Sequence, residues 1–201
     1  MIDLKQFALI KVFIRVAIFG SFSHVNAQNA FQNRLADSAF KLTFQKVTYE
    51  PAYVVIPYPN GDVSANTGVC SDVVIRAYRK LGVDLQKEVH LDMVSSFSLY
   101  PKIWNMKKPD SNIDHRRVPN LMTYFKRHGL SLKITMNPQD YLPGDIVCWR
   151  LEAGITHIGL VSNRLASDGQ TYQIIHNIGN GQVLEDCLFH FAIIGHYRYT
   201  K

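Results

Sequence analysis

The chain has 201 residues, of which 47% are hydrophobic and 19% charged, and its formal net charge is +6. This length and composition fit one ordinary globular domain with a substantial hydrophobic core, and no repeats, low-complexity tracts or interdomain linkers interrupt it. The basic residues are few and scattered, so the charge does not predict nucleic-acid binding, which needs a clustered basic surface.

Residues 1–27 have the pattern of a secretory signal peptide. Lys5 and Lys11 make a basic start, the run from Val12 to Phe22 is apolar, and Val25-Asn26-Ala27 fits the small-residue cleavage site. The apolar run is too short to span a bilayer comfortably, so we expect export with cleavage and no stable membrane insertion afterwards. Cleavage removes three basic residues and one acidic residue and leaves a net charge of +4, which suits a protein near anionic cell-wall polymers. We therefore expect a periplasmic, extracellular or cell-wall-associated protein.

The remaining residues, 28–201, are predicted to form a single domain that begins with helices. Helical periodicity and capping residues indicate helices over residues 29–46, from Cys70 to about Leu81, after the N-cap Asp84, and from Val118 to His128. Residues 100–119 have no regular period and contain three prolines. Such a long irregular segment with aromatic and apolar residues is typical of an ordered insertion near a functional site.

The chain after residue 129 is predicted to form strands. The β-prone segments are Leu130–Thr135, Asp145–Leu151, Thr156–Asn163, Thr171–Asn177 and Ile193–Tyr199, in addition to a short earlier run at Tyr53–Ile56. Helices followed by an antiparallel sheet predict an α+β domain.

Cys70 stands at the start of one of the predicted helices, after Gly68, which lets the backbone turn sharply into the helix. A thiol at a helix N-terminus is near free N–H groups and a partial positive charge, both of which stabilise a thiolate. Cys70 is therefore a candidate nucleophile, provided that a histidine reaches it from elsewhere in the fold. The alternative is a small buried residue at a helix start.

Two histidines lie on neighbouring predicted strands. His157 is followed by Gly159, whose lack of a side chain lets another chain approach closely, and His176 ends the next strand. A hairpin between these strands would bring the two imidazoles together on one face. A structural, hydrogen-bonded role for both histidines remains the alternative.

The three cysteines are an odd number for an exported protein, so at least one thiol stays free or pairs between chains. If Cys70 is free, Cys148 and Cys187 could form a disulfide, or both could be buried thiols. No Cys or His pair has the close spacing typical of zinc ligands, so we expect neither a metal nor an organic cofactor.

The order of these motifs resembles that of NlpC-type cell-wall cysteine peptidases, which are papain-like enzymes related to the CHAP amidases. The resemblance is carried by Tyr58, Cys70-Ser71, Pro143–Val147, His157–Val161 and Ile175-His176. It implies a papain-like α+β fold in which Cys70 is the nucleophile, His157 the base and His176 the group that orients His157. Tyr58 matches a tyrosine that helps to form the pocket beside the nucleophile.

Longer motifs resemble an uncharacterised family of exported bacterial proteins, a domain-of-unknown-function group allied to the same superfamily. They include the segment from Gly68 to Arg79, Asn112–Leu121, His176–Gly181 and Ile193–Tyr199, and together they extend over nearly the whole mature chain.

Several charged and polar residues near these motifs are candidates for substrate binding. Ser71 and Asp72 follow the nucleophile, although Asp72 replaces the glycine usual in NlpC-type peptidases and its charge disfavours a nearby thiolate. His115, Arg116 and Arg117 could bind a substrate carboxylate. An internal salt-bridge cluster with Asp114 that fixes the insertion is an equally good interpretation of these three residues.

The resemblance and the export signal together predict an amidase or endopeptidase that cleaves peptidoglycan stem peptides. We also expect a monomer. A non-catalytic cell-wall-binding module and an acyltransferase or hydrolase of another amide or ester are the alternatives.

Overall fold

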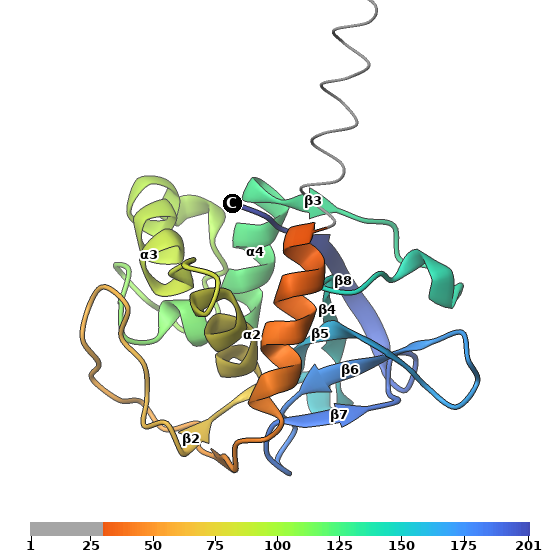
Figure 1. The fold of residues 1–201 in the computed structure, drawn as a ribbon. Helices are drawn as coiled ribbons and strands as arrows, with labels where there is room; N and C mark the ends of the chain where they lie inside the picture. Colours follow the sequence, from red (N-terminus) through yellow and green to blue (C-terminus); the bar gives the residue numbers. More distant parts are fainter. Residues whose placement is uncertain (1–29) are drawn as a thin grey trace, which may run out of the picture.

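A computed structural model describes residues 30–201, so the predicted signal peptide lies outside the described residues. Within that part of the chain, no helix combines the length and the apolar character needed to cross a bilayer. The described residues form helices that cover one face of an antiparallel sheet (Figure 1). The predicted α+β class is thereby confirmed.

The helices begin and end close to the predicted positions. They comprise residues 30–42, α2 (Cys70–Arg79), α3 (Leu85–Ser96) and α4 (Val118–His128). The predicted cap of α3 is confirmed, because the Asp84 side chain accepts a hydrogen bond from the Lys87 N–H. Short 3-10 turns occupy Phe97–Leu99, Asp114–Arg116, Pro138–Asp140 and Glu152–Gly154.

The strands form two sheets. A small parallel pair joins β1 (Thr48–Tyr49) to β2 (Thr67–Gly68), directly before α2. The larger sheet has six strands in the order β3-β8-β4-β5-β6-β7, and its neighbours are all antiparallel. Its strands are β3 (Leu130–Ser131), β4 (Ile146–Arg150), β5 (Thr156–Leu165), β6 (Tyr172–His176), β7 (Val183–Glu185) and β8 (Ala192–Arg198).

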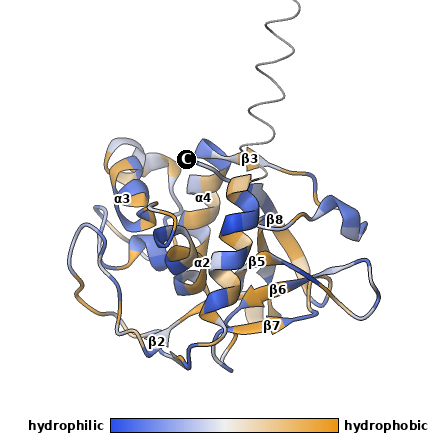
Figure 2. Cartoon of the chain, in the orientation of Figure 1, coloured by the Kyte–Doolittle hydropathy of each residue, from blue (hydrophilic) through white to orange (hydrophobic). Residues whose placement is uncertain are grey.

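The sheet carries a hydrophobic cluster on each face. The larger cluster lies between the helices and the sheet and includes Val74, Tyr78, Leu121 and Ile158. The smaller cluster surrounds Trp149 on the other face and includes Cys187. Apolar residues are accordingly prominent on β5, β6 and β8, while the long loop that leads to β2 carries both polar and apolar residues (Figure 2).

Two predicted strands differ from the structure because other groups satisfy their backbone. The strand expected at Leu130–Thr135 has only two residues. The Leu132 N–H still bonds the His196 carbonyl, but the Thr135 backbone N–H and carbonyl both bond the Tyr141 hydroxyl instead of a strand. The run Tyr53–Ile56 is not a strand, and the Ile56 N–H bonds the Asn112 side chain instead. Strands β1, β2 and β7 were not predicted, and all three are only two or three residues long.

Candidate active site

Cys70 is the first residue of α2 and lies against the sheet. Its sulfur is near the backbone N–H groups of Cys70, Ser71 and Ile158. Ile158 belongs to β5 and directly follows His157. The fold therefore brings the thiol beside the strand position that carries the candidate base.

The thiol is enclosed, with only 6% of the residue exposed. Burial raises the pKa of the Cys70 thiol to about 11; the charge of Asp72 raises it further, whereas the N–H groups lower it. The direction is opposite to that expected from the helix N-terminus, because the loss of solvation outweighs the stabilisation of a thiolate by N–H groups. Cys70 is thus a neutral thiol at rest.

This state predicts how Cys70 is alkylated by iodoacetamide. Because the thiolate is the reactive form, the rate should rise about tenfold per pH unit between pH 7 and 9, without a plateau. Peptide mass spectrometry at timed intervals measures the rate at Cys70, and the unfolded chain, whose thiols have a pKa of about 8.5, is the reference. A rate that is already maximal at pH 6 to 7 would show a preformed thiolate.

The imidazoles of His157 and His176 are hydrogen-bonded, with 2.8 Å between His157 Nε2 and His176 Nδ1. Both residues are buried, and they lie on adjacent antiparallel strands. Gly159 packs against the strand of His176: a Cβ atom there would lie only 3.1 Å from the His176 Cβ and 2.8 Å from the Ile174 Cγ2. The predicted hairpin and the closeness of the two imidazoles are confirmed, and Gly159 makes room for the contact.

Glu185 extends this pair into a chain of three side chains. Its Oε2 lies 2.8 Å from His176 Nε2. An ionised carboxylate only accepts hydrogen bonds, so His176 carries its proton on Nε2 and accepts at Nδ1 from His157 Nε2. His157 then has an unprotonated Nδ1, the form that a general base requires.

Burial keeps both imidazoles neutral, in agreement with the assignment of one proton to each. It lowers the pKa of His157 to about 3, with a further contribution from the charge of His176. It also lowers the pKa of His176, although the hydrogen bond to Glu185 opposes that shift. In the described residues no hydrogen bond connects Cys70 with His157, whose Nδ1 is the nitrogen not engaged by His176.

Asn177 connects the end of β6 to the segment that leads into α2. Its Nδ2 donates to the Gly68 carbonyl at 3.2 Å, and its Oδ1 accepts from the Gly179 N–H at 3.1 Å. Because Gly68 is two residues before Cys70 and Asn177 follows His176, this buried amide sets the spacing between the thiol and the imidazoles.

Ser71, Asp72 and Arg116 form an internal cluster beneath Cys70. Asp72 accepts two hydrogen bonds from Arg116, each at 2.9 Å, and one from the Val69 N–H at 2.7 Å. The Ser71 hydroxyl donates to the Arg116 carbonyl at 2.8 Å. All three residues are buried, so their polar groups fix the first turn of α2 instead of facing a substrate as expected.

Of the other two members of the predicted carboxylate-binding group, His115 is enclosed, whereas Arg117 is partly exposed and pairs within the insertion. His115 is buried, and burial together with the charge of Arg116 lowers its pKa to about 3. Arg117 pairs with Asp114 at 3.3 Å and lies over the Trp104 ring, 4.3 Å from its centroid. The interpretation as an internal cluster that fixes the insertion therefore describes Arg117, whereas Arg116 pairs with Asp72.

Tyr58 lies away from the cysteine. Its ring packs edge-on against His90 of α3, with 5.0 Å between the centroids. Tyr49 at the end of β1 is the tyrosine near Cys70, whose charge contributes to the raised pKa of the Tyr49 hydroxyl after the larger effect of burial. The tyrosine near the thiol is therefore Tyr49 and not Tyr58, which the resemblance had implied.

All three thiols are free, so the disulfide considered for Cys148 and Cys187 is absent from the described structure. Cys148 belongs to the cluster under the helices, and Cys187 belongs to the cluster on the opposite face of the sheet. The sheet itself separates them.

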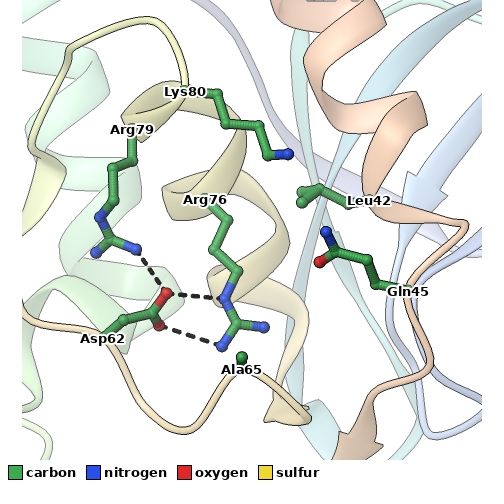
Figure 3. Close-up of a pocket in the computed structure, with 7 residues that line it drawn as sticks. All are labelled: Leu42, Gln45, Asp62, Ala65, Arg76, Arg79 and Lys80. Atoms are coloured by element: carbon green, nitrogen blue, oxygen red, sulfur yellow. Dashed lines mark hydrogen bonds and ion pairs between the residues drawn. The ribbon is translucent and has the colours of Figure 1, made fainter.

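The other end of α2 is held by a second group of charges. Asp62 pairs with Arg76 at 3.0 Å and with Arg79 at 2.7 Å beside a pocket of about 290 Å³ (Figure 3). Arg76 also donates to the carbonyls of Ser64 and Thr67, so these contacts fix the loop that leads into Cys70. No candidate catalytic residue lines this pocket.

Known proteins with similar sequences or structures include one bacterial relative and two solved structures. The relative is the Escherichia coli (strain K12) protein described as uncharacterized protein YijF, with 55% identity over 165 residues, which cover 82% of this chain and 80% of that protein. NlpC1 from Trichomonas vaginalis has 19% identity and a TM-score of 0.43 over 85% of this chain and 45% of that one. NlpC2 from the same organism has 18% identity and a TM-score of 0.43 over 84% and 48%. The chain spans less than half the length of either solved structure.

The family model described as a domain of unknown function, DUF1287, matches residues 36–199. That range contains Cys70, both candidate histidines, Asn177 and Glu185. The chain belongs to the DUF1287 family.

Proposed function

We propose that the protein is an exported cysteine hydrolase that cleaves an amide bond through Cys70, His157 and His176. The observation that supports this most directly is the hydrogen-bonded series Glu185–His176–His157, which leaves an unprotonated imidazole nitrogen on the strand that packs against the thiol.

The proposed reaction starts from a neutral thiol and a neutral imidazole. His157 Nδ1 takes the proton of Cys70 as the sulfur attacks the amide carbonyl, and a carbon–sulfur bond forms. His157 then gives this proton to the amide nitrogen, the carbon–nitrogen bond breaks and the amine leaves. Water, deprotonated by His157, attacks the thioester, which releases the acid and regenerates the thiol.

The start of α2 supplies the groups that stabilise the charge developing in this reaction. The N–H groups of Cys70 and Ser71 already lie near the sulfur, at the helix end where the backbone dipoles are positive. An oxyanion formed on a carbonyl bound to that sulfur would accept hydrogen bonds from such groups. His176 would hold the His157 ring in its basic form, and Glu185 would hold that of His176.

Peptidoglycan stem peptides are the proposed substrate class. This part of the proposal is supported by the resemblance of the motifs to cell-wall peptidases and by the signal-like segment at residues 1–27. The mild positive charge after removal of that segment, +4, is compatible with an anionic wall.

Digestion of purified peptidoglycan tests the function. The wild-type protein should release soluble muropeptides with new amino and carboxyl ends, detected by mass spectrometry, and Cys70→Ala should release none. Cys148→Ala removes another buried thiol of the same core cluster and is the matched control, which should keep its activity. Equal fragments from wild type and Cys70→Ala would refute the hydrolase; wall binding without any fragments would indicate a binding module.

A further inference from the structure

Three side chains with metal-binding atoms meet on the outer side of the histidine pair. His176 Nε2, Glu185 Oε2 and Cys187 Sγ lie within 4.8 Å of one another. Nε2 is 2.8 Å from the carboxylate oxygen and 3.5 Å from the sulfur. An imidazole nitrogen, a thiol and a carboxylate are the ligands that zinc prefers, with a water in the fourth position of an open site.

This cluster was not predicted from the sequence, because its residues do not have the close spacing of zinc motifs. The fold brings them together through the pairing of β6 with β7, which places His176 opposite Val183. Cys187 then follows β7 and turns back towards His176.

We propose that this cluster binds a divalent cation of the zinc type and that binding inhibits the hydrolase. His176 and Cys187 are buried and fixed, whereas the Glu185 side chain is 52% exposed and gives the cation a route from solvent. Ligands of a tetrahedral zinc are about 3.4 Å apart, so the 3.5 Å between His176 Nε2 and Cys187 Sγ already fits, and the exposed Glu185 carboxylate is the group that has to shift. The negative charges of Glu185 and Asp186, both of which raise the pKa of the Cys187 thiol, attract a cation to the same place.

The inhibition follows from which nitrogen of each imidazole carries the proton, and it rests on the proposed function. A cation on His176 Nε2 needs the lone pair of that atom, so the proton of this imidazole must sit on Nδ1. His176 Nδ1 then donates to His157 Nε2, and the proton of His157 sits on Nδ1. Each imidazole keeps one proton and the Cys187 thiol releases its own to solvent, but His157 no longer has a free nitrogen to accept the thiol proton of Cys70.

Direct binding of Zn²⁺ tests the site without any assay of activity. The reduced protein is titrated with Zn²⁺ in competition with a chromophoric chelator. Wild type should bind one ion, Cys70→Ala should bind equally well, and Cys187→Ala and Glu185→Gln should each bind at least tenfold more weakly. Glu185→Gln changes a half-exposed side chain, so it keeps the test decisive if Cys187→Ala does not fold.

The opposite pattern would overturn the proposal. If Cys70→Ala loses the ion while the Cys187 and Glu185 variants keep it, zinc sits on the candidate nucleophile instead, and if wild type does not bind, the site does not exist. In the activity assay, wild type should be inhibited by Zn²⁺ and restored by chelator, and Cys187→Ala should need at least tenfold more Zn²⁺. A wild-type protein that binds the ion but never releases muropeptides would refute the hydrolase and leave the metal site standing.

Discussion

Arg116→Ala is expected to lower the free energy of unfolding by about 3–5 kcal/mol, the usual cost of removing one partner from a buried ion pair. The side chains of Arg116 and Asp72 are each only 3% exposed, and two hydrogen bonds join them. Without the guanidinium, the Asp72 carboxylate stays enclosed beneath the first turn of α2 and keeps only the bond from the Val69 N–H as compensation. Urea unfolding followed by circular dichroism measures the change.

Two variants show whether the loss comes from the pair. Arg117→Ala removes the neighbouring arginine, which is 18% exposed and contacts Asp114 at 3.3 Å. It should cost less than Arg116→Ala, because it removes one longer contact from a partly exposed guanidinium instead of two short bonds from a buried one. Adding Asp72→Ala to Arg116→Ala removes the uncompensated charge and should restore part of the lost stability. A loss below 1 kcal/mol for Arg116→Ala, or a further loss in the double variant, would contradict this account of the pair.

The same ion pair explains how an aspartate is tolerated next to the candidate nucleophile. The sequence indicates that Asp72 disfavours a thiolate, and its charge does raise the pKa of Cys70. Arg116 forms two hydrogen bonds with that carboxylate and balances its charge within the cluster. The consequence is that these contacts hold the first turn of α2 in place.

Local sequence signals predicted the elements whose ends depend only on residues close in the chain. The helix after Asp84 and the ending of α4 at His128 follow from capping and periodicity, which depend on neighbouring residues alone. The approach of His157 to His176 could be predicted too, because two adjacent strands with a short connection pair as a hairpin.

The remainder of the site depends on contacts between distant segments, which no local pattern encodes. Arg116 meets Asp72 across 44 residues, and Asn177 meets Gly68 across 109. Glu185 lies on a three-residue strand and its side chain is half exposed, so neither periodicity nor hydrophobicity distinguishes it from an ordinary surface acid. The one sequence signal near Asn177 was its position within the motif that follows His176.

The pKa of Cys70 could not be predicted for a related reason. A helix N-terminus can be recognised from sequence, and it lowers the pKa of a thiol. How completely the sheet encloses that thiol can be seen only in the fold, and at Cys70 enclosure has the larger effect. The resting site is thus a neutral thiol and a neutral imidazole. In the proposed reaction a proton has to pass from the thiol to the imidazole, so that proposal depends on the basic nitrogen of His157.

His157→Ala is therefore expected to lower kcat/KM for the proposed hydrolysis by about 10²–10⁴-fold, the range typical of a lost general base. His190→Ala, which removes an exposed histidine after β7, is the matched control and should retain activity. Circular dichroism establishes that each variant is folded. Release of muropeptides by His157→Ala at more than a tenth of the wild-type rate would exclude His157 as the base.

Two further variants test whether His176 and Glu185 act through His157. His176→Ala leaves the base in place but removes the acceptor that keeps its proton on Nε2, so the loss should be smaller than for His157→Ala. Glu185→Gln keeps a hydrogen-bonding side chain, but an amide can either donate or accept, so it no longer selects one tautomer of His176. The loss of activity in Glu185→Gln should be the smallest of the three. Because the three groups act through one another, Glu185→Gln should add little loss to His176→Ala, whereas independent roles would make the two losses multiply.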